Sequence, residues 1–222
     1  FPAQLNYDPV KDFAPIVNVA QGGFVLMAHP SFPAKNLKEL IGVIQKQPGK
    51  WSYASSGAGG SQHLAMEMIR SMAGNMDMQH IPYKGFGQAL GDVLSGQVAM
   101  LFGGATASTP IIRSGKLKPL AVTAAKRVDW VPNIPTFEEE DIKLPLRSWE
   151  GYHFPVGVPR EYVERMNTEL RRVYDTPSFR TNVVERVGLV PNTGTPEAFD
   201  QHIRAQLKAV GELVNYLGIK PE

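Results

Sequence analysis

Glycine and serine crowd residues 55–61 (SSGAGGS), between a strand-like run at 51–54 and an apolar-periodic segment that follows. The first amides of a helix have no partner inside the helix, and its N-terminus carries about half a positive charge. Glycine lets the backbone approach a ligand closely. The amides of Gly59, Gly60 and Ser61, with the Ser61 hydroxyl, could therefore bind an anion. A tight turn with Ser61 as the N-cap explains the same residues equally well.

The familiar phosphate and nucleophile motifs do not fit this loop. A P-loop needs a lysine after its last glycine, and none is present here. A dinucleotide fingerprint needs a third glycine where Gln62 stands, and a nucleophile elbow needs glycine where His63 stands. The anion that suits the loop is therefore small, and a carboxylate fits best.

His63 could act as a catalytic base one turn into the predicted helix. No acidic residue is evident in the sequence to orient it, so we expect a packing or hydrogen-bonding role. The other histidines are scattered without the spacing of metal ligands: His29, His80, His153 and His202. The acidic run at 138–141 (EEED) is typical of a solvated face. We predict no catalytic residue, no metal site and no cofactor.

Composition restricts the class of protein. The chain has 222 residues, 43% hydrophobic and 20% charged, with a formal net charge of +2 and no cysteine. Near-balanced charge argues against a nucleic-acid partner, and the missing cysteines exclude disulfides and thiolate metal sites. No apolar run approaches the ~18 residues of a membrane span. The first residues resemble neither a signal peptide nor a start with methionine, so we expect a processed chain or a piece of one.

Strand-like and helix-like segments alternate along the chain. The predicted strands are 15–20, 24–28, 51–54, 78–81, 98–102 and 119–122. One predicted helix is capped by Asn36 and stopped at 48–49, and another runs through 89–94 and is ended by Gly96. The other predicted helices are 62–72, 109–114, 160–174, 177–187 and 196–217. This alternation predicts α/β architecture with mostly parallel sheets and crossover helices. Ligands of such sheets bind at the carboxyl ends of the strands, where loops 55–61, 83–87 and 103–106 are glycine-rich or unusual.

Five motifs then occur in order along the chain: 7–15 (YDPVKDFAP), 53–65 (YASSGAGGSQHLA), 80–85 (HIPYKG), 115–123 (GKLKPLAVT) and 133–139 (NIPTFEE). With these motifs the chain closely resembles the Bug/TctC family, the periplasmic solute receptors of tripartite tricarboxylate transporters, over essentially its whole length. The resemblance implies a periplasmic-binding-protein type II-like Venus flytrap of two lobes, without catalysis. It also implies a periplasmic location, a small carboxylate ligand, delivery to a membrane permease and a monomer when intact.

The resemblance also predicts the domains. Family members carry further strand–helix units before the motif found here at 7–15, so we expect an incomplete first lobe. Residues 1–24 and 152–222 would form the remainder of lobe 1, and residues 25–151 a complete lobe 2. The chain would cross between the lobes near 21–24 and 147–152. The predicted hinge residues there are Gly22, Gly23, Ser148 and Gly151.

The family's binding residues map onto this chain position by position. Its Ser-x-Gly-x-Gly-Thr/Ser-x-x-His loop falls on residues 55–63, its Tyr-Lys-Gly turn on 83–85, and Ala58 stands where many relatives have a polar side chain. Gly103 stands where the family often has an Asp that contacts the ammonium group of a ligand. The loss of this Asp favours a carboxylic acid without an amino group, such as an aromatic or a dicarboxylic acid. The resulting ligand-binding set is Ser55, Gly57, Ala58, Gly59, Gly60, Ser61, His63, Tyr83, Lys84, Gly85, Gly103, Gly104, Ala105, Thr106 and Trp149.

Some of these roles stay open. Gly103, Gly104 and Ala105 would leave room for a bulky ligand, with the amides of Ala105 and Thr106 as donors. Trp149 fits either a core position or a cleft wall. Two other functions remain: a flytrap-fold enzyme that uses Ser61 and His63, or a sensor or scaffold that has lost its ligand.

Overall fold

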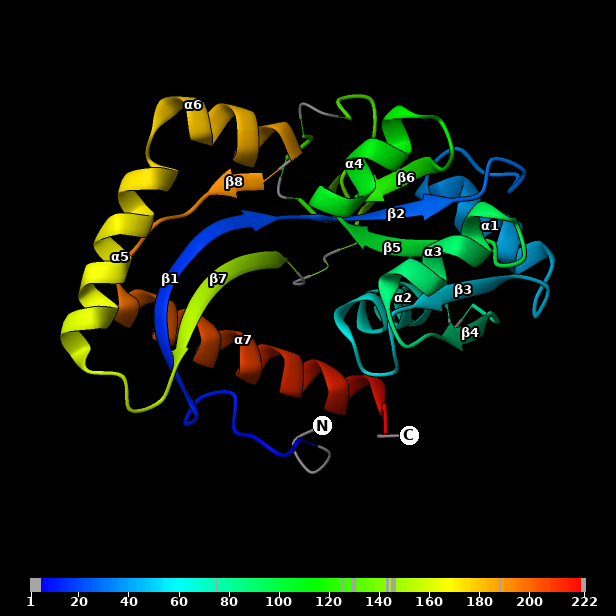
Figure 1. Ribbon diagram of the computed structural model, residues 1–222. Coiled ribbons are helices and arrows are strands. Elements are labelled where there is room, and N and C mark those ends of the chain that lie inside the picture. The colour runs from blue at the N-terminus through cyan, green and yellow to red at the C-terminus, as the bar shows by residue number, and fades with distance from the viewer. Residues whose placement is uncertain are drawn as a thin grey trace. The chain divides into compact units, whose positions relative to one another are not determined.

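The computed structural model describes residues 5–74, 76–124, 126–128, 131–142, 144, 147–187 and 189–220 (Figure 1). Residues 1–4 of the predicted segment 1–24, and parts of the irregular span 129–145, lie outside the described residues. The chain separates into two compact units. Unit 1 combines the chain up to Gly22 with Ser148–Tyr216, and unit 2 consists of Gly23–Arg147 with the residues from Leu217 on.

Unit 2 is built on a five-stranded sheet in the order β4-β3-β5-β2-β6. Its strands are β2 (Phe24–Ala28), β3 (Ser52–Ser55), β4 (Gln79–Pro82), β5 (Met100–Gly104) and β6 (Lys118–Val122). Strand β3 runs parallel to both β4 and β5. Strand β2 is antiparallel to β5 and to β6, so β5 and β6 are parallel to each other. The predicted parallel arrangement therefore holds for β3, β4, β5 and β6, with β2 inserted in the opposite direction.

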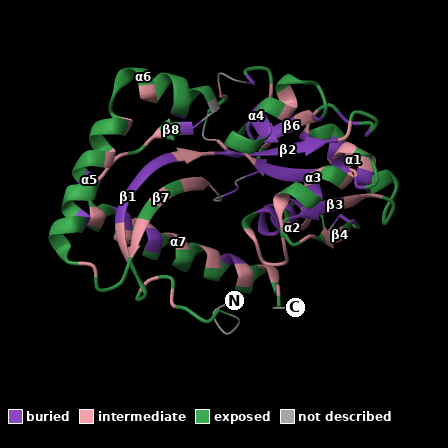
Figure 2. Cartoon of the chain, in the orientation of Figure 1, coloured by how far each residue is buried: buried purple, intermediate pink, exposed green. Residues whose placement is uncertain are grey.

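Four helices of unit 2 have the predicted apolar spacing: α1 (Leu37–Lys46), α2 (Ser61–Met72), α3 (Phe86–Leu94) and α4 (Ala105–Arg113). In α1, for example, Leu37, Leu40 and Ile44 are all fully buried. Helix α4 begins four residues before the predicted 109–114, directly after β5. All five residues of β2, an interior strand between β5 and β6, are buried (Figure 2). Full burial of side chains such as Leu26 and Met27 contributes about 1.5–3 kcal/mol each.

Unit 1 has a three-stranded antiparallel sheet in the order β7-β1-β8. Its strands are β1 (Phe13–Gly22), β7 (Ser148–Pro155) and β8 (Leu189–Pro191), accompanied by α5 (Arg160–Tyr174) and α7 (Pro196–Leu217). The expectation of mostly parallel sheets is wrong for the described part of this unit. A crossover helix enforces parallel pairing only between consecutive strands, whereas β1 and β7 come from distant parts of the chain.

Two further differences concern the C-terminal third. The sequence pattern did not predict β7. The predicted helix 177–187 is instead a short α6 (Pro177–Phe179), a π-helical turn (Arg180–Val184) and a 3₁₀ turn (Glu185–Val187).

A 3₁₀ turn at Glu138–Glu140 lies in the acidic run. Within the described residues, no helix is both long enough and apolar enough to cross a membrane.

Two of the three places where the chain passes between the units lie at the ends of neighbouring strands. Gly22 ends β1, Ser148 begins β7, and the two residues are register partners. Gly151, predicted as a hinge glycine, lies inside β7 instead. A Cβ atom there would lie 2.2 Å from Cζ of Phe199, so close packing requires glycine at this position.

Candidate functional site

Three of the predicted loops meet at one edge of the unit 2 sheet, because β3, β4 and β5 are parallel and end on the same side. The amide of Tyr83 donates to the Ser55 carbonyl at 3.0 Å, which joins the second loop to the first. A Cβ atom on Gly57 would lie 3.7 Å from the Tyr83 carbonyl oxygen. A Cβ atom on Gly103 would lie 3.2 Å from the ring of Phe86, the first residue of α3.

The helices that follow these loops all start at a glycine. Gly60, Gly85 and Gly104 are the N-cap residues of α2, α3 and α4, and none of these helices has an acidic residue in its first turn. Ser61 is therefore the first helical residue and not the N-cap. The first intrahelical bond of α2 runs from the Leu64 amide to the Gly60 carbonyl. The amides of Ser61 and Gln62 precede that bond, so this end can attract an anion.

The 55–61 loop uses several of its amides internally. The Ser56 amide donates to Oε1 of Gln62 at 2.9 Å, and the Gly57 amide donates to Oγ of Ser55 at 3.2 Å. The Gly59 amide donates to Nδ1 of His63 at 3.0 Å. A ligand clasp made by the Gly59 amide would have to break that bond. The predicted role of Gly59 as an amide donor is thus better filled by the first residues of α2.

Two histidine side chains next to the 55–61 loop stack on each other. The rings of His63 on α2 and His80 on β4 are parallel within 5°, with centroids 4.0 Å apart. His80 also stacks on Tyr53 at 4.8 Å, and its Nε2 lies 2.8 Å from Oγ of Ser55. Burial, followed by the proximity of His63, lowers the pKa of His80 to about 4. The sequence pattern did not identify His80 as part of the site, although its place in a strand beside the loop was visible.

Glu67 is the acidic residue that the sequence reading missed. Its Oε1 lies 3.8 Å from Nε2 of His63, one helical turn further along α2. The same oxygen accepts a hydrogen bond from the Tyr53 hydroxyl and pairs with Nη1 of Arg70 at 2.6 Å. The i, i+4 spacing of residues 63 and 67 is the signal that could have found it. With Nδ1 bonded to Gly59 and Nε2 facing Glu67, His63 is not placed to take a proton from Ser61.

The 83–85 turn is fixed by a tyrosine–aspartate bond. The Tyr83 hydroxyl donates to Oδ2 of Asp92 on α3 at 2.5 Å. Burial and this bond raise the pKa of Tyr83 to about 12, so the hydroxyl keeps its proton. Lys84 is exposed beside it, and Gly85 is the N-cap of α3.

The space at Gly103 is already filled. A Cβ atom there would lie 2.4 Å from Oγ of Ser108 and 2.8 Å from Cε of Met27. The expectation that Gly103 leaves room for ligand bulk is therefore wrong in this structure. Gly104, in contrast, has nothing within 4 Å of its Cβ position. The Ala105 amide, a predicted ligand donor, instead donates to the Gly23 carbonyl at 3.2 Å.

Trp149 packs within unit 1. Its indole ring makes edge contacts with Phe199 and His202 of α7, at centroid distances of 5.4 and 5.6 Å. Of the two interpretations of Trp149, a core position and a cleft wall, these contacts within unit 1 favour the core position. Among the described residues, no group of three or more His, Asp or Glu side chains is arranged to hold a metal ion.

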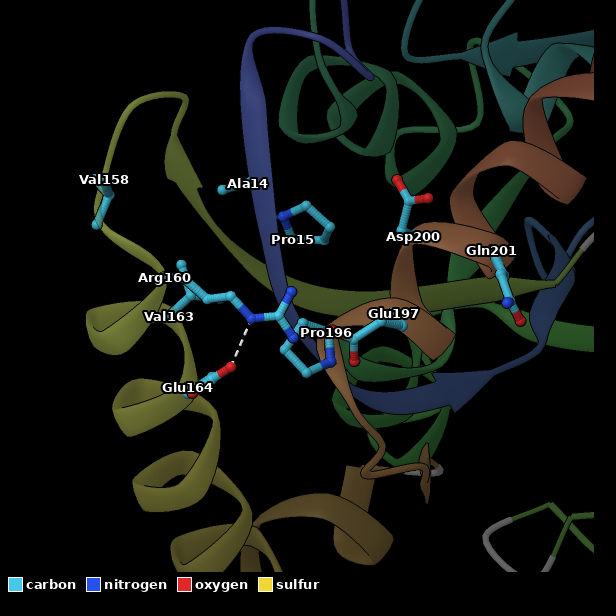
Figure 3. Close-up of a pocket in the computed structure, with 10 residues that line it drawn as sticks. All are labelled: Ala14, Pro15, Val158, Arg160, Val163, Glu164, Pro196, Glu197, Asp200 and Gln201. Atoms are coloured by element: carbon cyan, nitrogen blue, oxygen red, sulfur yellow. Dashed lines mark hydrogen bonds and ion pairs between the residues drawn. The ribbon is translucent and has the colours of Figure 1, made fainter.

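A separate hollow of about 530 Å³ lies in unit 1 between β1, α5 and α7 (Figure 3). Arg160 spans its rim and pairs with Glu164 and with Glu197, both at 2.6 Å. These bonds raise the pKa of Arg160. None of the predicted ligand-binding residues lines this hollow. Its lining consists of Ala14, Pro15, Val158, Arg160, Val163, Glu164, Pro196, Glu197, Asp200 and Gln201.

Comparison with known sequences gives a family match. Residues 1–219 match the model of the tripartite tricarboxylate transporter family receptor (TctC). A protein encoded in the tcbD–tcbE intergenic region of Pseudomonas sp. (strain P51) is 29% identical over 217 residues, which are 96% of this chain and 64% of that protein. The chain spans about two thirds of the length, between 64% and 66%, of the first curated relatives that it matches.

Solved structures agree with that match. The periplasmic binding protein BugD is 32% identical with a TM-score of 0.89, over 97% of this chain and 73% of that one. R. palustris Rpa4515 with adipate is 29% identical with a TM-score of 0.93, over 99% and 73%. MatC from Rhodopseudomonas palustris with bound malate is 25% identical with a TM-score of 0.85, over 95% and 72%.

Proposed function

Since the chain belongs to the tripartite tricarboxylate transporter receptor family, we propose that it binds a small organic carboxylate at the loop edge of unit 2. The family resemblance and the flytrap α/β fold class inferred from the sequence are both confirmed. The family and the similar structures are solute receptors and not enzymes. The proposal concerns this chain's own site and ligand.

One observation carries the proposal. Helices α2, α3 and α4 start at one edge of the sheet, each at a glycine and each without an acidic residue in its first turn. All three ends carry a positive potential, and α2 adds the open amides of Ser61 and Gln62, which together favour a carboxylate over a neutral or cationic ligand. Ser61 is exposed at the first of these ends, so its hydroxyl is available as a further donor.

The ligand that we propose has no ammonium group. The loops 55–61, 83–85 and 103–106 contain no Asp or Glu, and the nearby Asp92 carboxylate already accepts the Tyr83 hydroxyl. An ammonium group left without a counter-charge in a dry site would be costly. Adipate and malate, the acids named with two of the similar structures, also have none. We favour an aliphatic or aromatic acid with one or two carboxylates.

The wider role follows the family. We propose that the two units are the lobes of a flytrap receptor, with residues Gly22, Gly23 and Ser148 as hinges. The receptor would act in the periplasm as a monomer and deliver its ligand to the permease of a tripartite tricarboxylate transporter.

A ligand screen tests the proposal. The melting temperature of the purified chain is measured with adipate, malate, benzoate, glutamate and lysine, and hits are titrated by calorimetry. We expect a shift with at least one plain acid and none with the two amino acids. Stronger binding of the amino acids would contradict the ligand class. No shift with any acid would favour a ligand-free sensor or scaffold, and product formation would favour an enzyme.

A further inference from the structure

His63 faces inward and accepts a hydrogen bond from the loop. The residue is 8% exposed, and its Nδ1 accepts the Gly59 amide at 3.0 Å. A ring nitrogen that accepts an N–H bond cannot carry a proton. His63 is therefore a neutral imidazole whose hydrogen is on Nε2.

The charge of Glu67 favours this tautomer. Its Oε1 lies 3.8 Å from Nε2 of His63, which favours the proton on that side of the ring. The carboxylate is itself held by Arg70 at 2.6 Å and by the hydroxyl of Tyr53. Its position therefore does not depend on His63, and at 3.8 Å it acts on the ring through its charge and not through a hydrogen bond.

The His80 ring stacks on one face of the His63 ring. The two imidazoles lie 4.0 Å apart and parallel, so two positive charges there would repel each other strongly. His80 also reaches Ser55 Oγ at 2.8 Å, and that oxygen accepts the Gly57 amide. The groups that face His63 are thus Tyr53 on β3, Glu67 and Arg70 on α2, and His80 on β4.

From this geometry we infer that His63 is a positioning residue of the carboxylate site, in the tautomer that the Glu67 carboxylate favours. Neutral His63 draws the Gly59 amide inward and so keeps loop 55–61 in the shape that leaves the first amides of α2 open to the ligand. The inference rests on the proposed function for its effect on binding. A proton on Nδ1 would face the Gly59 N–H and break this bond.

A ligand-free experiment tests the bond itself. Two-dimensional ¹H–¹⁵N spectra of the chain are recorded between pH 8 and pH 5, with long-range spectra of the imidazole nitrogens. We expect His63 to carry its hydrogen on Nε2 at pH 8, and the Gly59 amide signal to shift with the titration of that ring. In the His63→Asn variant, whose Oδ1 can accept the same bond, the Gly59 signal should not titrate. A hydrogen on Nδ1 at pH 8 would overturn the inference. So would a Gly59 amide signal that does not shift when the His63 ring titrates.

A binding experiment tests the consequence. Adipate is titrated at pH 8 and pH 6 into the wild type and into the His63→Ala and His63→Asn variants, after thermal melts confirm that each is folded. We expect His63→Ala to bind about 10-fold more weakly at pH 8, the loss that an unsatisfied buried amide implies. His63→Asn should bind within about 3-fold of the wild type, because it keeps the acceptor.

The pH comparison separates positioning from direct contact. Between pH 8 and pH 6 the wild type should lose more affinity for adipate than His63→Asn does. The variant has no imidazole at position 63, so its affinity should change only because adipate itself is protonated. A wild type that gains affinity relative to His63→Asn at pH 6 would show an imidazolium touching the ligand and would overturn the inference. Unchanged binding by His63→Ala would do the same. If the wild type does not bind adipate, the ligand proposal fails for this acid, and the ligand-free spectra still decide the role of His63.

Discussion

The helices that start at the two edges of the unit 2 sheet differ in whether a side chain caps their first amides. At one edge α1 starts at Asn36, whose Oδ1 accepts the Glu39 amide at 2.8 Å, while Oε2 of Glu39 accepts the Lys35 amide at 2.8 Å. At the other edge α2, α3 and α4 start at glycines without such caps. The antiparallel direction of β2 is what places α1 apart from the others. A capped end stabilises the fold, whereas an uncapped end keeps its amides available for a ligand.

The largest effect is expected from placing an acid on the uncapped end of α2. In Gly60→Asp the new carboxylate would occupy the positive end and repel the ligand, so adipate binding should weaken by about 100-fold, as two like charges ~5 Å apart imply. Gly60→Ala is the matched control, because its Cβ meets the same Gly57 carbonyl at 3.3 Å without adding charge. Calorimetry measures both. Equal affinity for the Asp and Ala variants would remove α2 from the site.

The next effect is a loss of stability in mild acid. Since burial and His63 lower the pKa of His80 to about 4, against about 6.5 when unfolded, the folded chain binds fewer protons between these values. The free energy of unfolding should therefore fall as pH drops from 6.5 towards 4. The change should be below the full ~1.4 kcal/mol per pH unit, because His80 is only half buried.

Urea unfolding at pH 7 and pH 5 measures this change in the wild type and in His80→Gln. The variant keeps a polar group towards Ser55 but cannot titrate, so it should lose less stability than the wild type. An equal loss in both proteins would assign the pH dependence to other groups.

A smaller effect is expected at the capped edge. Asn36→Ala removes the acceptor for the Glu39 amide and should lower the free energy of unfolding by about 1 kcal/mol. Adipate affinity should not change, since this end lies at the opposite edge of the sheet. Urea unfolding and calorimetry check the two parts, with Asn36→Asp as a variant that keeps a cap. Weaker adipate binding in Asn36→Ala would break the contrast between the edges.

The smallest effect is expected from Ser61→Ala. The hydroxyl would give the ligand one neutral hydrogen bond, so its loss should weaken adipate binding by about 3-fold to 5-fold. Ser56→Ala, at an exposed serine of the same loop, is the matched control and should bind as the wild type does. A loss beyond about 50-fold in Ser61→Ala would give the hydroxyl a larger role than the helix amides.

The sequence predicted the elements of unit 2 well, because their apolar spacing and glycine boundaries are local signals. Leu37, Leu40 and Ile44 of α1 are buried as their spacing indicates. It did not predict β7 or the antiparallel sheet of unit 1, since pairing between β1 and β7 depends on residues far apart in the chain.

The same distinction holds for the site. Loops 55–61 and 83–85 could be predicted to meet, because parallel strands end at the same edge. Which amides stay open could not, since that depends on the side chains of Gln62 and His63 turning back to the loop. The space at Gly103 was misjudged for a similar reason, because Ser108 fills it from the next helix. Glu67 was within reach of the spacing rules and was overlooked.

The position of β2 between β5 and β6 has a consequence for how the chain folds. Leu26 pairs with Phe102 on one side and with Ala121 on the other. Among the strands of this sheet β2 is synthesised first, yet its neighbours β5 and β6 follow more than 70 residues later. This hydrophobic segment therefore lacks both partners until β5 emerges and gains the second only with β6, so the pairing around β2 forms late in synthesis.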